Sequence, residues 1–274
     1  MSDSSLQAAV RTKLESAVIE RDPFPHVVIP DLLPEPFFRE LDDAIPPFTE
    51  FTEKGVRANL HLEKYLGRAP DHFRATWGRF RDEIVRGPLA EVLTRRFEDE
   101  IREKFATLYS AEIADEIMSG GLEIADGRIM LRKPGYTLKP HTDPAHFALT
   151  YLLYFTSADE DSSGALCLFQ PERTPELLHT STYYAENKEG IKAQLAKVVP
   201  ISRNLFVAFV NGARALHGVR VERGEAATPR LAFQAHLVPI DDPRRVDAAW
   251  LARMRDPVAR TRWEAWATEE AARQ

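Results

Sequence analysis

The stretch LFVAFVNGARALHGVRVERGEAATPRLAFQAHLV, residues 205–238, carries the pattern that decides the fold. An apolar run of β-favouring residues leads into a turn, and His217 follows it. A charged loop then precedes a second run of this kind, which opens with Arg230. Short apolar runs bounded by turn residues are typical of strands in an antiparallel β protein.

The same pattern of short apolar runs bounded by turn residues extends over residues 121–240. Several short strands with irregular connections favour a sandwich or jelly roll over a wound parallel sheet. We therefore predict an α+β protein with a mainly β core, a double-stranded β-helix (a cupin-like jelly roll), with N-terminal and C-terminal helices packed outside. The predicted strands are Leu122–Leu131, Phe147–Phe155, Leu166–Phe169, Leu205–Val210 and Arg230–Val238.

Residues 1–120 have a mostly helical pattern. Residues 1–20 and 35–45 each fit a helix, with a short extended run at His26–Ile29 between them. From about residue 70 to residue 118, apolar side chains recur at steps of three and four, so we expect them on one helix face packed in the core. These are Leu89, Val92, Leu93, Phe97, Ile101, Phe105 and Leu108, and Gly120 and Gly121 form a natural stop after them.

Two further segments complete the predicted organisation. Residues 171–197 look helical around Glu186–Lys197, and an insertion of this length is often a lid or a binding loop. Residues 241–274 predict a helical tail that docks on the outside. Because no repeat or Gly/Ser-rich linker divides the sequence, we expect a single catalytic domain over residues 1–274.

Composition excludes several classes of protein. The net charge of −6 and the pI of about 5.8 disfavour a general nucleic-acid binder. The only cysteine, Cys167, allows no intramolecular disulfide framework and no Cys-rich zinc site. The first residues lack the apolar core of a secretory signal, and no long apolar run suggests a membrane span. We expect a cytoplasmic protein whose partners include neither nucleic acid nor membrane.

The stretch LRKPGYTLKPHTD, residues 131–143, ends in a motif that can bind a metal ion. His141 and Asp143 flank one residue, so in an extended strand both side chains point to the same face. The motif alone is a weak signal. Among eight histidines and 42 acidic residues about one such pair is expected by chance, and His61-Leu62-Glu63 is a second match.

His217 makes the signal more specific. Two histidines and one carboxylate on neighbouring strands form a facial triad, the ligand set of non-haem Fe(II), and leave three coordination positions open. Two open positions suit a bidentate 2-oxo acid and the third suits O2. At the start of a strand, the planar guanidinium of Arg230 can bind the distal carboxylate of 2-oxoglutarate through two hydrogen bonds.

The ordered combination resembles the Fe(II)/2-oxoglutarate-dependent dioxygenases, specifically the branch built like prolyl 4-hydroxylases. The resemblance covers about residues 121–240 and the segment PFPHVVIPDLLP near residue 23. It implies that His141, Asp143 and His217 are the iron ligands and the catalytic centre. It also implies that Arg230 anchors 2-oxoglutarate with the matching tyrosine of the strand LTYLLYF, Tyr154, and that Gln234 lines the same pocket.

The sequence departs from this branch in one respect. The gap from His217 to Arg230 is longer than is common, and the family's basic residue is often a lysine, so Arg220 is the spare candidate. Family members that halogenate replace the carboxylate with a small residue. The presence of Asp143 therefore favours hydroxylation or another oxidation.

The resemblance implies hydroxylation of an unactivated C–H bond in a small molecule or natural-product precursor, with release of succinate and CO2. A protein side chain, as in prolyl hydroxylases, is the alternative substrate, and it would need a long open groove. Arg57, Asn59, Trp77 and Arg79 could contact either substrate, but surface or packing roles are expected for each. A non-catalytic, cupin-like metal-binding protein is the third hypothesis, although the complete set of site residues counts against it. The sequence leaves the substrate and the oligomeric state undetermined.

Overall fold

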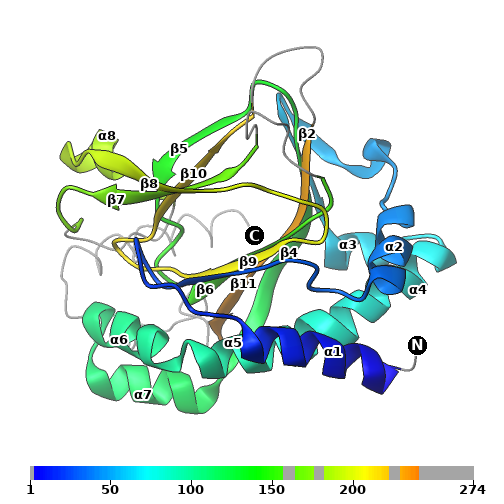
Figure 1. The fold of residues 1–274 in the computed structure, drawn as a ribbon, viewed down its shortest axis with the longest axis horizontal. Coiled ribbons are helices and arrows are strands. Elements are labelled where there is room, and N and C mark those ends of the chain that lie inside the picture. The colour runs from blue at the N-terminus through cyan, green and yellow to red at the C-terminus, as the bar shows by residue number, and fades with distance from the viewer. Residues whose placement is uncertain (1–2, 157–163, 176–181, 222–228, 241–274) are drawn as a thin grey trace, which may run out of the picture.

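The larger of the two sheets is antiparallel throughout and runs in the order β1–β9–β6–β11–β4–β3–β2 (Figure 1). It belongs to a computed structural model that describes residues 3–156, 164–175, 182–221 and 229–240. Within these residues its strands are β1 (His26–Ile29), β2 (Thr52–Lys54), β3 (Arg57–His61), β4 (Leu122–Arg132), β6 (Leu149–Tyr154), β9 (Phe206–Val210) and β11 (Arg230–Pro239).

The smaller sheet has the order β5–β10–β7–β8 and faces the larger one. Its strands are β5 (Thr137–His141), β7 (Leu166–Pro171), β8 (Ala193–Val199) and β10 (Leu216–Arg220). One apolar cluster joins the sheets: Leu166 and Leu168 of β7 pack with Val207 and Phe209 of β9. Two facing antiparallel sheets with helices outside form the predicted jelly roll.

Alternation along the strands gives the larger sheet two different faces. Leu131 of β4 and Phe233 of β11 belong to the core beneath the helices. Their neighbours Met130 and Ala232 point the other way, toward the smaller sheet. Because successive side chains of a strand alternate, Arg132, Arg230 and Gln234 also belong to this inner face.

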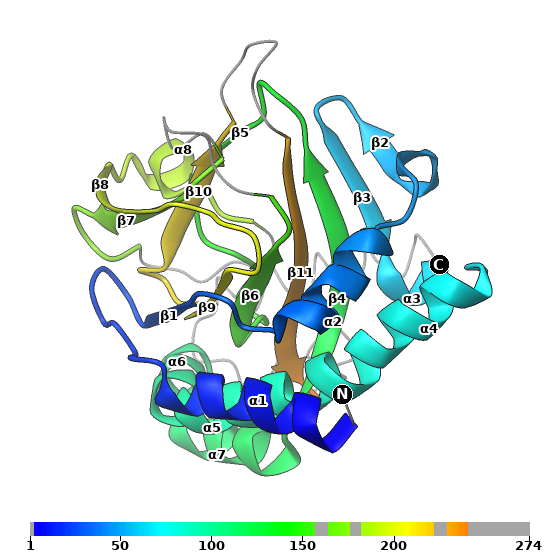
Figure 2. The same cartoon turned by 45° about the vertical axis from the view of Figure 1, so that its right-hand side comes forward.

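Helices cover the outer face of the larger sheet (Figure 2). They are α1 (Asp3–Ser16), α2 (Glu35–Asp43), α3 (Leu62–Leu66), α4 (Asp71–Arg79), η2 (Phe80–Leu89), α5 (Ala90–Arg96), α6 (Glu98–Leu108) and α7 (Ala111–Gly120), with a short turn of helix, η1 (Phe48–Glu50), before β2. Every residue of the predicted apolar stripe from Leu89 to Leu108 is buried, which confirms its role in the core. The stripe spans more than one helix, because the chain leaves helical geometry at Phe97 between α5 and α6.

The sequence pattern placed the end of the helical region correctly. The Ser110 side chain accepts a hydrogen bond from the Ile113 backbone N–H and so caps the start of α7. Gly121 ends the helix with a φ of 87°, a left-handed conformation that glycine adopts without strain. β4 begins at the next residue.

One sequence expectation was incomplete and one was wrong. Residues 1–120, where mostly helices were expected, also contain β2 and β3, which extend the larger sheet at its edge. The helix expected around Glu186–Lys197 is only α8 (Ala185–Glu189), and the rest of that segment contributes to β8. β8 is an edge strand with mostly exposed side chains, so its sequence AQLAKVV lacks the apolar alternation of a buried strand. The predicted C-terminal helical tail, residues 241–274, lies outside the described residues.

Candidate metal centre

His141 and His217 come from adjacent strands of the smaller sheet. His141 is the last residue of β5, and the antiparallel register places it directly opposite His217 in β10. The centroids of the two imidazole rings lie 4.3 Å apart. Gly218 is required for this close approach, because a Cβ at this position would lie 2.6 Å from the carbonyl oxygen of Leu138 in β5.

Both imidazoles keep the same nitrogen available. Nδ1 of His141 lies 2.9 Å from the Lys139 carbonyl oxygen, and Nδ1 of His217 lies 3.1 Å from that of Ala215. A carbonyl oxygen can only accept a hydrogen bond, so in the neutral ring Nδ1 carries the proton and Nε2 retains its lone pair. Backbone contacts of this kind fix the tautomer and orientation of histidines that bind metals.

Asp143 faces both histidines. Its Oδ1 atom lies 3.8 Å from Nε2 of His141, and its Oδ2 atom lies 3.7 Å from Nε2 of His217. One ligand atom from each of the three residues lies within 4.8 Å of the others. Within the described part of the chain, this is the only group of His, Cys, Asp or Glu side chains arranged so that it can hold a metal ion.

A buried hydrogen-bond network orients the carboxylate. The Thr150 hydroxyl donates to Oδ2 of Asp143 at 2.7 Å and accepts a hydrogen bond of the same length from the Asn211 amide. Nδ1 of His236 lies 2.9 Å from the same hydroxyl. His236 therefore lies behind the carboxylate rather than among the ligand atoms, and the network holds Asp143 in place before any metal binds.

The protonation states of these side chains suit a cation. Burial lowers the pKa of His141 to about 4, with a further contribution from His217, so its imidazole is neutral at pH 7. Burial alone would raise the pKa of Asp143. The neighbouring His217, His236 and His141 and the Thr150 hydrogen bond outweigh that effect and hold its pKa below the usual range. A carboxylate and two imidazoles with free lone pairs form the donor set of a divalent transition metal.

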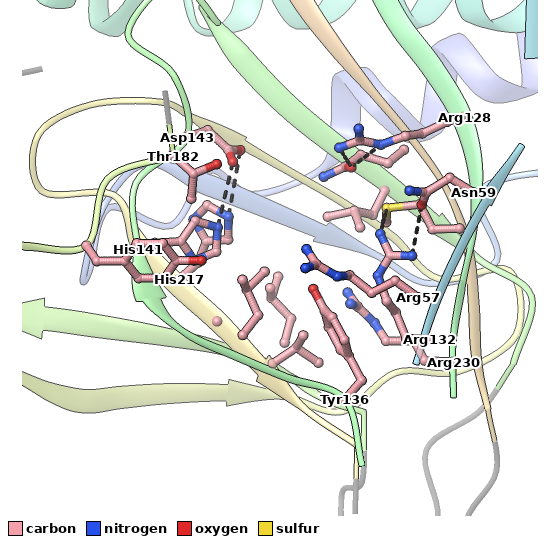
Figure 3. Close-up of a pocket in the computed structure, with 18 residues that line it drawn as sticks. Arg57, Asn59, Arg128, Arg132, Tyr136, His141, Asp143, Thr182, His217 and Arg230 are labelled. Carbon is pink, nitrogen blue, oxygen red and sulfur yellow. Dashed lines mark hydrogen bonds and ion pairs between the residues drawn. The ribbon is translucent and has the colours of Figure 1, made fainter. Parts of the chain in front are cut away.

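The three side chains border a cavity of about 270 Å³ between the two sheets. Figure 3 shows two opposed groups of polar side chains around it. His141, Asp143 and His217 lie on one side, whereas Arg57, Arg132, Arg230 and Tyr136 lie on the other. A bound small molecule would therefore have the metal centre at one end and a group of guanidinium ions at the other.

Arg230 is the first residue of β11 and is buried in the wall of the cavity. Its Nη2 atom donates to the Tyr154 hydroxyl at 2.8 Å, so the structure brings together the two side chains that the sequence pairs. The Nε atom of Arg230 is buried and has no hydrogen-bond partner among the described residues. A buried donor without a partner is costly, so this atom is suited to a ligand that carries a hydrogen-bond acceptor.

Several solved protein structures are similar to this one. The non-haem α-ketoglutarate-dependent epimerase SnoN from nogalamycin biosynthesis is 17% identical, with a TM-score of 0.45 over 86% of this chain and 82% of that one. HygX from Streptomyces hygroscopicus, with nickel, 2-oxoglutarate and hygromycin B bound, is 12% identical, with a TM-score of 0.49 over 78% and 83%. A prolyl 4-hydroxylase structure from Phytophthora capsici is 14% identical, with a TM-score of 0.47 over 96% and 76%.

Of these three, SnoN is named as α-ketoglutarate-dependent, HygX is described with 2-oxoglutarate bound, and the third is named as a prolyl 4-hydroxylase. No family model matches the sequence, and no curated protein matches it either. At these identities and TM-scores the likeness is one of fold, so the chemistry of the site rests on the chain's own residues.

Gln234 lines the cavity as predicted, but its amide is already engaged. Its Oε1 atom accepts hydrogen bonds from Nε and Nη2 of Arg128 at 3.0 and 2.6 Å. Arg128 was not predicted as a site residue. It lies opposite Gln234 in the β4–β11 register, so only the pairing of two distant strands reveals it.

The structure adds several further residues that the sequence did not assign to the site. Arg132 and Tyr136 line the cavity from β4 and the turn after it, and Thr182 and Tyr184 line it from the segment expected as an insertion. Arg57 and Asn59 of β3 line it too, although surface or packing roles were expected for both. These residues carry no local motif, since only the folded chain brings them to one cavity.

The remaining sequence candidates lie elsewhere. Arg220, the spare candidate for the anchor, is exposed at the end of β10 and is not among the residues that line the cavity. His61, from the second His-x-Glu match, is exposed at the end of β3. A second cavity of about 420 Å³ between α6 and the β9–β10 connection contains none of the predicted site residues and is lined mainly by apolar and surface groups.

Proposed function

We propose that this protein is an Fe(II)- and 2-oxoglutarate-dependent oxygenase that hydroxylates a C–H bond of a small molecule. One observation carries the proposal. The Nε2 atoms of His141 and His217 and the carboxylate of Asp143 converge at one side of a cavity, while a buried guanidinium with an unpartnered Nε, that of Arg230, lies on the other. This is the donor set that Fe(II) and a dianionic cosubstrate require.

The chain's own residues have two tasks in this proposal. His141, Asp143 and His217 would hold the metal through one atom each and leave its cavity-facing side open. When bound, Fe(II) and 2-oxoglutarate would supply the activation of O2 that oxidises a C–H bond, with succinate and CO2 as co-products. The protein itself then needs no acid or base at the oxidised carbon.

Arg230 would bind the distal carboxylate of 2-oxoglutarate. Its backbone lies in β11 and its Nη2 atom is fixed by Tyr154, so the guanidinium is already oriented before the ligand arrives. Burial excludes water from this contact, which strengthens a charge-assisted hydrogen bond. The Nε donor that lacks a partner would gain one.

The lining of the cavity argues against hydrolysis by paired carboxylates or by a thiol nucleophile. Asp143 is the only acidic side chain among the described residues that line it, and in the proposal that carboxylate is a metal ligand. The single cysteine, Cys167, does not line the cavity. Neither a pair of carboxylates nor an activated thiol faces the bound molecule.

Hydroxylation of a protein side chain is the alternative within the same chemistry. The cavity volume of about 270 Å³ lies just below the roughly 300–1,000 Å³ of typical small-ligand pockets, which favours a small molecule over a length of peptide chain. A protein that binds a metal without catalysing a reaction is the alternative from a different functional class. Such a protein would need the metal ligands but would not need a buried anion anchor on the opposite wall.

Succinate formation tests the proposal. The purified protein is loaded with Fe(II) without oxygen, 2-oxoglutarate binding is measured by calorimetry, and succinate is quantified after oxygen is admitted. We expect one 2-oxoglutarate per chain and slow succinate release in the wild type, with both lost in H141A. The matched control is H61A, which removes an exposed histidine from the second His-x-Glu match and should behave like the wild type.

Two results would contradict the proposal in different ways. Iron binding without 2-oxoglutarate binding would support the non-catalytic metal-binding protein. Equal succinate formation in the wild type and in H141A would mean that the three proposed ligands are not the catalytic centre.

A further inference from the structure

Three arginines form a row across three neighbouring strands of the larger sheet. The antiparallel register places Arg57 of β3 opposite Arg132 of β4, and Arg132 opposite Arg230 of β11. Residues directly opposite each other share a face, and all three side chains line the cavity. Figure 3 shows them together on the side away from His141 and His217.

Such a row costs stability. Like charges directly opposite each other on neighbouring strands repel, and here the repulsion acts in a partly buried site. Among the described lining residues the only acid is Asp143, which Figure 3 places on the other side of the cavity. A fold that retains this arrangement has its positive charge available for a ligand.

Arg132 is held as a fixed donor. It donates to the backbone carbonyl oxygen of Ala58 at 3.2 Å and to the Asn59 side-chain oxygen at 2.9 Å, and its guanidinium lies 5.2 Å from the centre of the Tyr136 ring. Burial lowers its pKa to about 10, and Arg230 contributes to the same direction. Arg132 therefore remains charged at pH 7 while its surroundings disfavour that charge.

The surroundings of Arg57 differ from those of Arg132. It is exposed, and it makes no hydrogen bond or ion pair with any residue in the described part of the chain. Burial raises the pKa of the Tyr184 phenol, and the charge of Arg57 lowers it in part. The Tyr184 ring lies 5.7 Å from the ring of His141. Tyr184 is thus a neighbour of His141 and lies within electrostatic reach of Arg57.

The charges of the proposed complex do not balance without a further anion. Fe(II) would carry two positive charges, and these would be neutralised by Asp143 and by the chelating carboxylate of 2-oxoglutarate. The distal carboxylate would neutralise Arg230. The three other arginines that line the cavity, Arg57, Arg128 and Arg132, would still contribute positive charge there. Arg132 is buried, where charge is expensive, whereas Arg57 is exposed.

We propose that the cavity binds a second anion besides 2-oxoglutarate: the substrate is a small molecule that carries an oxyanion, a carboxylate or a phosphate, and Arg57 binds that group with Arg132 behind it. This inference rests on the proposed function, because it takes Arg230 as the anchor of 2-oxoglutarate. The planar fork of a guanidinium matches either oxyanion through two parallel hydrogen bonds. The carbon that is oxidised then lies between this group and the metal.

Simple anions test the inference without knowledge of the substrate. The protein loaded with Fe(II) and 2-oxoglutarate is kept free of oxygen and titrated with inorganic phosphate, and separately with acetate, by calorimetry. We expect one anion per chain, with phosphate or acetate bound more tightly according to which oxyanion the site prefers. R57Q should weaken the binding by about tenfold or more, because hydrogen bonds to a charged group contribute at least that much.

Two variants serve as controls. R57K keeps the charge but loses the planar fork, so it should retain part of the affinity. R39Q removes an exposed arginine of α2 that pairs with Glu35, away from the cavity, and should leave the affinity unchanged. All four proteins should bind 2-oxoglutarate equally, which separates this inference from the cosubstrate site.

Three outcomes would overturn the inference. These are the absence of phosphate and acetate binding by the loaded wild type at millimolar concentration, equal affinities in the wild type and R57Q, and strict competition between the anion and 2-oxoglutarate. The last outcome would mean that one anion site, the cosubstrate's, accounts for all the arginines. Failure of the wild-type protein to bind 2-oxoglutarate would instead contradict the proposed function.

Discussion

The two sides of the cavity are built in different ways. On the metal side, His141 and Asp143 come from one short stretch, and only His217 must be brought in from the neighbouring strand. On the opposite side, Arg57, Arg132 and Arg230 are separated by most of the chain and meet only because β3, β4 and β11 pair in register. The first side is encoded by a local pattern, whereas the second is encoded by the fold.

The two sides also differ in charge. Two imidazoles and one carboxylate surround the proposed metal position, while guanidinium ions gather across from it. The proposed dianionic cosubstrate would be drawn to both sides at once, through chelation at one end and an ion pair at the other. Changes on one side should therefore affect metal binding, and changes on the other should affect anion binding.

The largest effect is expected for D143A. Removal of the only carboxylate among the three ligands should lower Fe(II) affinity by more than about 100-fold, since even the loss of a residue that only supports a ligand costs roughly 10- to 100-fold. Fe(II) binding measured by competition with a chelator tests this. The arginine side of the cavity should be unaffected. A loss of phosphate binding to the metal-free protein would therefore contradict the independence of the two sides.

R230Q should produce the complementary effect. We expect 2-oxoglutarate affinity to fall by about 30- to 150-fold, or roughly 2–3 kcal/mol, because a buried charge-assisted hydrogen bond is lost. Fe(II) affinity in the absence of 2-oxoglutarate should stay at the wild-type value. Calorimetric titrations of the two ligands separate the two quantities, and a parallel fall in both would show that the two sides are not independent.

The metal side should also make stability depend on pH. The pKa of His141 is lowered from 6.5 to about 4, so below pH 6.5 the unfolded chain takes up a proton that the folded chain does not. Stability of the metal-free protein should be complete above pH 6.5 and fall as the pH decreases toward 4, by at most about 3 kcal/mol from this residue. Urea unfolding at several pH values should show a shallower decline in H141Q, and equal declines would exclude His141 as the cause.

A smaller effect is expected for T150V. The hydrogen bond to Oδ2 of Asp143 is lost while the shape of the side chain is retained, so Fe(II) affinity should fall by about tenfold. T156V is a comparison just after the end of β6, because the Thr156 hydroxyl accepts a hydrogen bond from the Leu231 backbone N–H and is not a partner of Asp143. An unchanged affinity in T150V would show that the histidines alone orient the metal.

The smallest effect concerns stability on the arginine side. R57Q removes a like-charge pair across β3 and β4, so the unfolding free energy should rise by a few tenths of a kcal/mol even as anion binding weakens. Urea denaturation at low ionic strength tests this, and added salt should reduce the difference. A destabilised R57Q would mean that Arg57 supports the fold rather than a ligand.

These differences also explain what the sequence could predict. The largely apolar strands β6 and β9 were identified because both of their faces are buried. β5 was missed because it is an edge strand that contains Pro140 and has mostly polar, half-exposed side chains. The prediction of Arg230 and Tyr154 as partners was possible because a family pattern exists for them, and the two side chains are hydrogen-bonded.

Arg57, Arg128 and Arg132 could not be predicted in the same way. Each is one charged residue among many in the sequence, and a surface position is the usual place for such a side chain. Only the pairing of strands shows that they line a common cavity. The roles of His141, Asp143, His217, Arg230, Tyr154 and Gln234 in binding remain predictions that the experiments above address. None of the described helices is long and apolar enough to cross a membrane.

The row of arginines has a consequence for folding itself. A shift of one residue in the pairing of β4 or β11 would turn Arg132 or Arg230 to the face that now carries Leu131 and Leu231. Those positions lie in the apolar layer under the helices, where a guanidinium would be more costly than one that faces a polar cavity. The charges of Arg132 and Arg230 therefore disfavour misaligned sheets, so the side chains proposed to bind anions also help the chain to select its own register.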